Sequence, residues 1–188
     1  MRRRVRNWIL LLALGTTAGA HAADPQTLTV EGVSVRLPLG LQADAAYVPP
    51  GNPPTDARVE LGRLLYFDKR LSDDETVACA TCHDPAHGFA EPRATSTGIR
   101  NQVGARNAPT VLNRLFSKEQ FWDGRAADLE EQAHGPIVNK IEMGMASHDA
   151  CVERLRRVKG YAPLFQKAFG TPDITMPRVA PLATAVRM

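Results

Sequence analysis

The residues with the clearest chemistry in this sequence are two cysteines and a histidine in the run Cys79-Ala80-Thr81-Cys82-His83. The spacing C-x-x-C-H is that of a covalent attachment site for c-type haem. Two thiols one helical turn apart can form thioethers with the two vinyl groups of one porphyrin, and the next residue can direct a ring nitrogen at the iron. The chain's own cysteine and histidine content would produce this pattern by chance in roughly one sequence in a thousand. The sequence therefore predicts one covalently bound haem.

Two other uses of the cysteine pair have to be weighed. A structural zinc site needs four ligands, and Cys151, His87 and His134 offer no second closely spaced pair. A disulfide between Cys79 and Cys82 is the alternative in an oxidising compartment. Haem is the favoured interpretation, because the chain also begins with a signal for export.

The N-terminus has the three regions of a secretory signal. Arginines at positions 2, 3, 4 and 6 form the basic region, residues 8–14 the apolar region, and Ala20-His21-Ala22 an A-x-A cleavage site. We expect cleavage after Ala22 and export to a bacterial periplasm. An uncleaved membrane anchor is the alternative, and the small residues that end the apolar run disfavour it.

Removing residues 1–22 changes the charge balance. The whole chain has 23 Lys and Arg against 20 Asp and Glu, and the removed segment holds four Arg and no acid, so 19 basic residues remain against 20 acidic ones. Binding to nucleic acid needs basic residues clustered on the folded domain, so no nucleic-acid partner is expected. Aromatic residues are only 6% of the chain, and a buried porphyrin would supply part of the missing core.

The N-terminal part of the mature chain has weak periodicity. Apolar residues alternate over residues 28–37 on either side of Glu31-Gly32, which suits a short hairpin or an extended arm. Residues 49–54 contain four prolines and read as a turn-rich lead-in. After it, Val59, Leu61, Leu64, Leu65 and Phe67 are spaced for one buried helical face that Asp68 ends.

The part of the chain after the cysteines alternates between irregular and helical patterns. Residues 83–110 are rich in Gly, Pro, Asn and Thr and have little periodicity, which is typical of a functional loop or one that wraps a ligand. Helical spacing returns at residues 126–133, 149–158 and 161–169, the last closed by Gly170. We expect an all-α, c-type cytochrome-like haem domain with long irregular loops. The predicted organisation is a signal peptide (1–22), an N-terminal arm with the proline-rich lead-in (23–56) and the haem domain (57–188).

Residues on both sides of the haem motif resemble a known family. The matching segments, in chain order, are Leu61–Asp68, Arg70–Ser72, Cys79–His83, Arg106–Thr110, Phe121–Ala126, Glu131–Ala133, Gly135-Pro136 and Glu142-Met143. This ordered set is far more specific than C-x-x-C-H alone, and it resembles the N-terminal haem domain of bacterial dihaem cytochrome c peroxidases and the related MauG proteins. In that family the N-terminal haem reacts with peroxide, and a second C-type haem domain passes electrons to it. This sequence has one C-x-x-C-H motif, so the resemblance implies a chain cut at or near the domain junction.

The resemblance implies a role for each matching residue around the iron. His83 corresponds to the proximal iron ligand, and Cys79 and Cys82 to the thioether residues. Gln132 and Glu142 correspond to the distal pair. A carboxylate with a reference pKa of about 4.3 is ionised at neutral pH and can move a proton during cleavage of peroxide, while a neutral amide can donate a hydrogen bond without adding charge.

Two further positions correspond to the junction with the second haem domain. Trp122 matches the tryptophan that lies between the two haems, where an indole π system can relay an electron. Asn107 matches a calcium ligand whose companions belong to the second domain. Without the resemblance, Trp122 would be interpreted as a core residue, and Gln132 and Glu142 as solvated helix residues.

The sequence departs from the family in two places. Ile99 stands where many of these peroxidases have a histidine that blocks the sixth iron position, and an isoleucine cannot bind iron. Among the remaining histidines, His87 is predicted to lie at the surface or the haem edge, and His134 and His148 to be structural or solvent-facing. Cys151 is left unpaired, and its spacing with Leu155 and Val158 predicts a buried small hydrophobic residue.

The resemblance implies reduction of hydrogen peroxide to water, with electrons from a small cytochrome or cupredoxin. Association of two copies into a homodimer is left open. One alternative is a monohaem electron carrier, in which the iron takes a second ligand from Met143 or Met145, or less readily Met176. Another is MauG-like oxidation of protein side chains. The presence of a single C-x-x-C-H motif also allows a third interpretation, a truncated product without function.

Overall fold

The computed structural model describes residues 26–49 and 51–179. The predicted signal peptide and its cleavage site lie outside the described residues. Within them, helices are the main regular structure, accompanied by one small sheet, so the expected all-α class is broadly correct. No described helix combines the length and the apolar character needed to cross a membrane.

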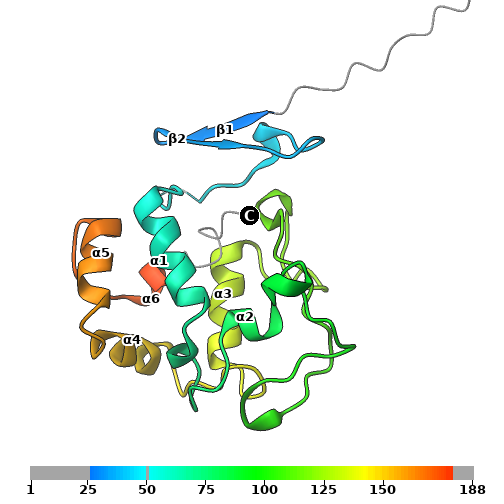
Figure 1. Ribbon diagram of the computed structural model, residues 1–188, viewed down its shortest axis with the longest axis vertical. Coiled ribbons are helices and arrows are strands. Elements are labelled where there is room, and N and C mark those ends of the chain that lie inside the picture. The colour runs from blue at the N-terminus through cyan, green and yellow to red at the C-terminus, as the bar shows by residue number, and fades with distance from the viewer. Residues whose placement is uncertain (1–25, 50, 180–188) are drawn as a thin grey trace, which may run out of the picture.

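Of the two arrangements expected for the N-terminal segment, the structure has the short hairpin. Strand β1 (Thr27–Val30) pairs antiparallel with β2 (Val33–Arg36), in a register that sets Leu28 opposite Val35. The two turn residues, Glu31 and Gly32, have φ of 46° and 80°, as a type I′ turn requires. The hairpin stands at one end of the molecule, apart from the helices (Figure 1).

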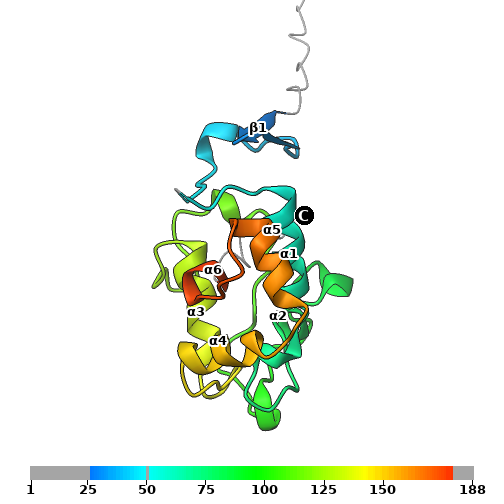
Figure 2. The same cartoon turned by 90° about the vertical axis from the view of Figure 1, so that its left-hand side faces the viewer.

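Six α-helices form the body of the chain. They are α1 (Asp56–Tyr66), α2 (Cys79–Cys82), α3 (Leu129–Val138), α4 (His148–Arg156), α5 (Tyr161–Phe169) and α6 (Met176–Val179), all within the described residues. Helix α5 lies along α1, and α4 packs against α3, α5 and α6 (Figures 1 and 2). The element that carries the two cysteines, α2, is a single turn on the other side of α1 from α5 (Figure 1).

Capping residues set the helix boundaries, and this shifts some of them from the predicted positions. The Thr55 side chain caps α1 by accepting a hydrogen bond from Arg58 N at 3.3 Å. Asp128 caps α3 by accepting from Glu131 N at 2.8 Å, so this helix starts at Leu129 and not at residue 126. Helix α5 and its Gly170 terminus, with φ of 73°, are as predicted.

The prediction that Phe67 belongs to the buried face of α1 is wrong. Helix α1 ends at Tyr66, and the Phe67 side chain, one position beyond the last turn, is 49% exposed. Tyr66 is buried in its place, and the two rings meet edge to face with centroids 5.3 Å apart. Leu61 and Leu65 are buried as predicted.

The hydrophobic core collects buried residues from every α-helix except α2, and from the segment after α3. Its buried members include Leu61, Leu65, Leu71, Ile99, Ile137, Met143, Met145, Cys151, Leu155, Tyr161, Phe165 and Val179. A buried polar contact joins α5 to the turn after α1, because the Tyr161 hydroxyl donates to the Asp68 carboxylate, which also pairs with Arg70 Nε at 2.8 Å. Arg154 of α4 donates to the Ser72 carbonyl at 2.5 Å and the Asp73 carbonyl at 3.1 Å, which ties the same turn to α4.

The long irregular stretch after the cysteines is also present as predicted. Between Cys82 and Leu129 the described chain forms no α-helix, only the short 3-10 helices η3 (Pro85–His87), η4 (Ile99–Asn101) and η5 (Arg114–Phe116). Isolated β-bridges pair Asp84 with Ala90, Thr97 with Val103 and Gln120 with Ala126. These loops extend from α2 along one side of the molecule (Figure 1).

Candidate functional site

The C-x-x-C-H motif forms the single helical turn α2, which places both cysteines on one element. The turn is held at its start, where Ala78 N donates to Thr81 Oγ1 at 2.9 Å, and closed at its end, where His83 N donates to Cys79 O at 3.0 Å. Cys79 and Cys82 are free thiols in this structure. The local chain therefore presents two thiols and an imidazole as one unit.

The His83 ring is oriented by a bond to a distant part of the chain. Its Nδ1 lies 2.9 Å from the Pro109 carbonyl oxygen, and the Tyr66 hydroxyl donates to the His83 carbonyl at 3.0 Å. A carbonyl only accepts, so Nδ1 carries the ring proton and the lone pair lies on Nε2. Burial also lowers the pKa of His83, which favours the neutral ring that can bind iron.

The donor set fits haem c better than zinc. Burial raises the pKa of the Cys79 thiol to about 12 and also raises the pKa of Cys82, so both thiols are neutral in the free chain, and a structural zinc site would need four ligands. Within residues 26–49 and 51–179, no cluster of three or more His, Cys, Asp or Glu side chains could hold a metal ion. Two thiols on one turn, followed by one neutral imidazole, are the groups that attach a haem c covalently and bind its iron.

Glu142 lies in the segment that follows α3, and its charge acts on the cysteine turn. After burial, the carboxylate of Glu142 is one of the groups that raise the pKa of Cys79 and of Cys82. Burial raises the pKa of Glu142 itself, and the positive charge of Arg125 opposes that rise. Oε1 of Glu142 accepts a hydrogen bond from Asn139 Nδ2 at 2.9 Å. The fold therefore brings together the cysteines and a carboxylate that lies about 60 positions later in the chain.

The loop that bears Ile99 packs directly on the backbone of Glu142. Ile99 N donates to Glu142 O at 2.9 Å, and a Cβ at Gly98 would collide with the carbonyls of Ile141 and Glu142. The Ile99 side chain is fully buried and reaches Gly144, where any side chain would meet its Cδ1. Ile99 is thus a core residue in this structure.

The other distal residue of the resemblance, Gln132, is on α3 and partly buried. Among the hydrogen bonds of the described residues, none joins its side chain to Glu142 or to His83. The structure therefore places Glu142 where its charge acts on the cysteine turn, whereas a shared role for Gln132 stays a prediction.

Trp122 and Asn107, which the sequence separates by fifteen positions, are in direct contact. Trp122 Nε1 donates to the Asn107 carbonyl at 2.8 Å. The Trp122 side chain is 63% exposed, so the reading of this residue as core is wrong. Asn107 Nδ2 donates to the carbonyls of Glu91 and Arg93, both at 2.7 Å, so the amide braces the irregular loop. Calcium binding at Asn107 stays a prediction.

Among the described residues, the His87 and His148 rings have structural hydrogen-bond partners. His87 is exposed, and its Nδ1 lies 3.0 Å from Asp84 Oδ2. His148 of α4 places its Nε2 3.0 Å from the His134 carbonyl of α3, and the two rings are 5.3 Å apart between centroids. This pair joins α3 to α4.

Cys151 and two methionines lie in the core. Cys151 is fully buried, and burial raises the pKa of its thiol to about 11, which agrees with the predicted small hydrophobic role. Met143 and Met145, the alternative iron ligands, are buried members of the same core.

Sequence reasoning did not identify two residues that hold the site together. The Asn139 side-chain amide donates a hydrogen bond to the Glu142 carboxylate, and the Pro109 carbonyl accepts one from the His83 ring. Pro109 falls within a segment that resembles the family. Its contact with His83 is made by the backbone carbonyl, which every residue has, so the residue type does not reveal it. The helical pattern predicted from the sequence ends at residue 133, so Asn139 at the end of α3 had no positional signal.

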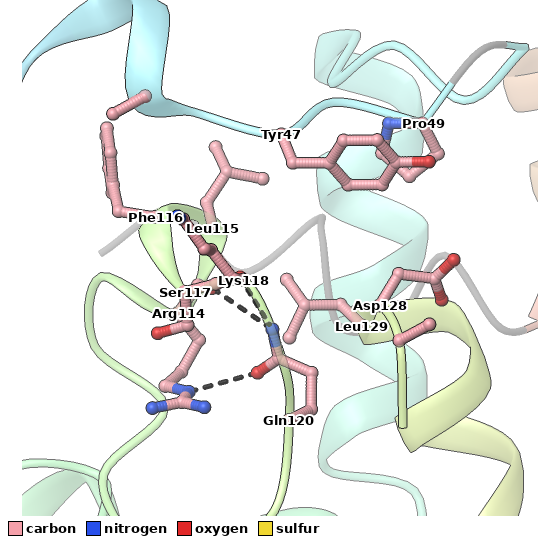
Figure 3. A pocket seen from close by; sticks show the side chains of 12 residues that line it. Tyr47, Pro49, Arg114, Leu115, Phe116, Ser117, Lys118, Gln120, Asp128 and Leu129 are labelled. Carbon is pink, nitrogen blue, oxygen red and sulfur yellow. Dashed lines mark hydrogen bonds between the residues drawn. The ribbon is translucent and has the colours of Figure 1, made fainter. Parts of the chain in front are cut away.

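A cavity of about 410 Å³ lies elsewhere, between the N-terminal arm, the η5 loop and the start of α3 (Figure 3). Tyr47, Leu115 and Leu129 are among the residues that line it. Gln120 is also part of the lining, but its amide is bonded within the loop, to Arg114 Nε at 3.1 Å and to the Ser117 carbonyl at 3.2 Å. The lining contains none of the predicted site residues.

Comparisons with known sequences agree with the motif and its surroundings. A sequence profile described as "Di-haem cytochrome c peroxidase" matches residues 56–186. The cytochrome c peroxidase Ccp of Escherichia coli (strain K12) is 51% identical over 105 residues, which cover 55% of this chain and 23% of that protein. The cytochrome c551 peroxidase of Nitrosomonas europaea is 38% identical over 164 residues, which cover 82% of this chain and 48% of that protein.

A solved structure has a similar fold over three quarters of this chain. It is described as a MauG-like protein associated with microbial copper homeostasis, and it superimposes with a TM-score of 0.67 at 28% sequence identity. The match covers 75% of this chain and 43% of that one. The chain thus spans less than half the length of these relatives.

Proposed function

The chain belongs to the di-haem cytochrome c peroxidase family, and from this premise we propose that it carries the peroxide-reacting haem site of an enzyme that reduces hydrogen peroxide to water. The observation that carries the proposal is the His83 ring, whose Nδ1 is held by the Pro109 carbonyl, directly after the one turn that bears both thiols. The charge of Glu142 acts on the same turn. An axial imidazole and a carboxylate near one haem are the parts that such chemistry needs.

In this proposal Cys79 and Cys82 form the thioethers of one haem c, and His83 is its proximal ligand. When bound, the haem supplies the iron centre at which peroxide is reduced. The chain's own contribution on this side is orientation: the Pro109 carbonyl fixes the ring proton on Nδ1 and increases the basicity of Nε2.

Glu142 is the residue that moves a proton. Its Oε1 accepts from Asn139, which leaves Oε2 to take a proton from peroxide and return one to the leaving oxygen. Burial raises its pKa, and a raised pKa brings a carboxylate closer to the operating pH, where a group works best as both base and acid. Gln132 is proposed as a neutral donor to the same substrate, and Trp122 as the group through which electrons arrive.

The partners follow from the chemistry. Reduction of hydrogen peroxide consumes electrons, so we propose a small cytochrome or cupredoxin as donor, in the periplasm. The exposed indole of Trp122 supports a route for electrons at the surface of this domain. The chain spans less than half the length of its relatives, so steady-state turnover with the donor is proposed for the longer protein.

A second candidate is oxidation of a protein side chain. It is favoured by the similarity to a solved structure described as MauG-like. The two candidate functions share the haem site and differ in the electron donor, which is a small redox protein in the first and the oxidised protein side chain in the second. The electron-carrier alternative is less favoured, because Met143 and Met145 pack in the core.

The proposal is tested on the purified, haem-loaded chain. Acid–acetone extraction should leave one haem per chain bound to the protein, as measured by mass spectrometry. Addition of hydrogen peroxide to the ferric protein should change the Soret spectrum rapidly, whereas steady-state oxidation of a reduced small cytochrome should be slow. Loss of the haem on extraction, or a spectrum that does not respond to peroxide, would overturn the proposal.

A further inference from the structure

Asn139 occupies the end of α3, where its N–H and its side chain make four hydrogen bonds and its carbonyl accepts two more, from Glu142 N and Gly144 N. Its N–H donates to the carbonyls of Gly135 and Pro136, at 3.2 and 3.3 Å. Its Oδ1 accepts from Ile141 N at 3.0 Å, which closes an Asx turn. Its Nδ2 donates to Glu142 Oε1 at 2.9 Å. The side chain is therefore shared between the local turn and the carboxylate.

The turn determines which end of the amide faces Glu142. Because a backbone N–H requires an acceptor, the Ile141 contact assigns the oxygen of the Asn139 amide to that side. The NH2 group then has to point at Glu142. A donor at this position stabilises the ionised carboxylate and restricts its rotamer, since one oxygen is bound and the other is left for substrate.

Among the described residues, few other groups near Glu142 could stabilise its ionised carboxylate or restrict its rotamer. Arg125 is the cation that acts on Glu142, and it is 2.7 Å from Asp123, with which it pairs. The thiols of Cys79 and Cys82 are the other titratable groups that interact with the Glu142 charge. The Glu142 backbone is fixed separately, by Ile99 N on one side and the Asn139 carbonyl on the other.

We propose that Asn139 is a positioning residue for the peroxide reaction, which holds the Glu142 carboxylate ionised and in one orientation through Nδ2. This inference rests on the proposed function of Glu142, because it assigns to Asn139 an effect that acts through that carboxylate. It adds a residue that the sequence resemblance did not identify.

The test variant is Asn139→Asp, which separates the two roles of the side chain. An aspartate keeps the acceptor for Ile141 N and hence the turn, but it replaces the donor toward Glu142 by a second carboxylate. Two carboxylates at this distance raise the pKa at which the pair takes up a proton, by about one unit or more. Lys140→Gln is the matched control, because it makes the same change of net charge at the adjacent exposed position without touching Glu142.

The readout is the titration of the Glu142 carboxyl carbon by nuclear magnetic resonance, in the diamagnetic ferrous carbon-monoxide form, with the signal assigned by its loss in Glu142→Gln. We expect a raised apparent pKa of Glu142 in Asn139→Asp, an unchanged value in Lys140→Gln and similar melting temperatures in both. The pH midpoint of the peroxide reaction should move with the pKa. An unchanged pKa of Glu142 in Asn139→Asp would overturn the inference.

A second measurement does not depend on how well the variant folds. In the wild-type protein the side-chain NH2 protons of Asn139 should shift with pH at the Glu142 midpoint, and this shift should be absent in Glu142→Gln. NH2 protons that do not respond to pH would also overturn the inference. If instead Glu142→Gln leaves the peroxide rate unchanged, the proposed function of Glu142 fails, while the titration still judges the Asn139 contact separately.

Discussion

Replacement of Glu142 by glutamine removes the proposed proton shuttle and changes little else. The amide oxygen of glutamine can still accept the bond from Asn139 Nδ2, and the backbone bonds of this residue to Ile99 and Asn139 do not involve the side chain. The change removes the one atom that can take and return a proton. The haem content and the melting temperature should therefore remain close to those of the wild type.

The expected effect is on the rate of the peroxide reaction. Loss of a general acid–base group costs a factor of about 10² to 10⁴ in rate, which corresponds to about 2.7 to 5.5 kcal/mol of activation free energy. Burial raises the pKa of Glu142 above its ordinary value. A base must be deprotonated to act, so the wild-type rate should rise with pH through this raised pKa. The ratio of wild-type to variant rate is therefore largest at high pH and shrinks as the pH falls.

The assay is stopped-flow mixing of the ferric haem-loaded protein with hydrogen peroxide, followed at the Soret band over a range of pH. Glu60→Gln serves as the control, because Glu60 lies on the exposed side of α1 and pairs with Arg63. It makes the same chemical change away from the site and should keep both the rate and its pH dependence. A Glu142→Gln protein that reacts as fast as the wild type, or that retains the wild-type pH step, would refute the assignment of this carboxylate.

Three further outcomes are expected. The ferric protein should be high-spin and bind cyanide without prior reduction, because Ile99 cannot bind iron and lies in the core; a low-spin His/Met signal in electron paramagnetic resonance would instead support the electron-carrier alternative. Cys151→Ser should lower the free energy of unfolding, measured by chemical denaturation, by about 1 to 3 kcal/mol, because it puts a hydroxyl at a fully buried position, and an unchanged value would show that the site can hydrate. Burial, and then the neighbouring His148, lower the pKa of His134 in the folded protein, so the unfolded chain binds the proton more tightly and stability should fall as the pH drops below about 6.5. Thermal melting over this range should show a smaller slope in His134→Gln than in the wild type, with the exposed His87→Gln variant as control.

Some features of this protein depend only on residues close together in the chain, and these were predictable. The C-x-x-C-H motif forms one turn because its capping and closing bonds lie within residues 78–83. The N-terminal hairpin and the α5 terminus at Gly170 follow from alternation, helical spacing and a glycine in the left-handed region. The family resemblance added Glu142, Gln132 and Trp122, because an ordered set of short motifs is recognisable without coordinates.

Other features depend on which distant segments meet, and only the tertiary structure decides them. The partner of the His83 ring is a backbone carbonyl 26 positions away, at Pro109. Trp122 is exposed and bonded to Asn107, and Ile99 lies in the core on the backbone of Glu142. These contacts are made by irregular loops without periodicity, through backbone atoms that every residue possesses. Residue type therefore identifies the groups that can do the chemistry, while the path of the loops determines which carbonyl or amide holds each of them in place.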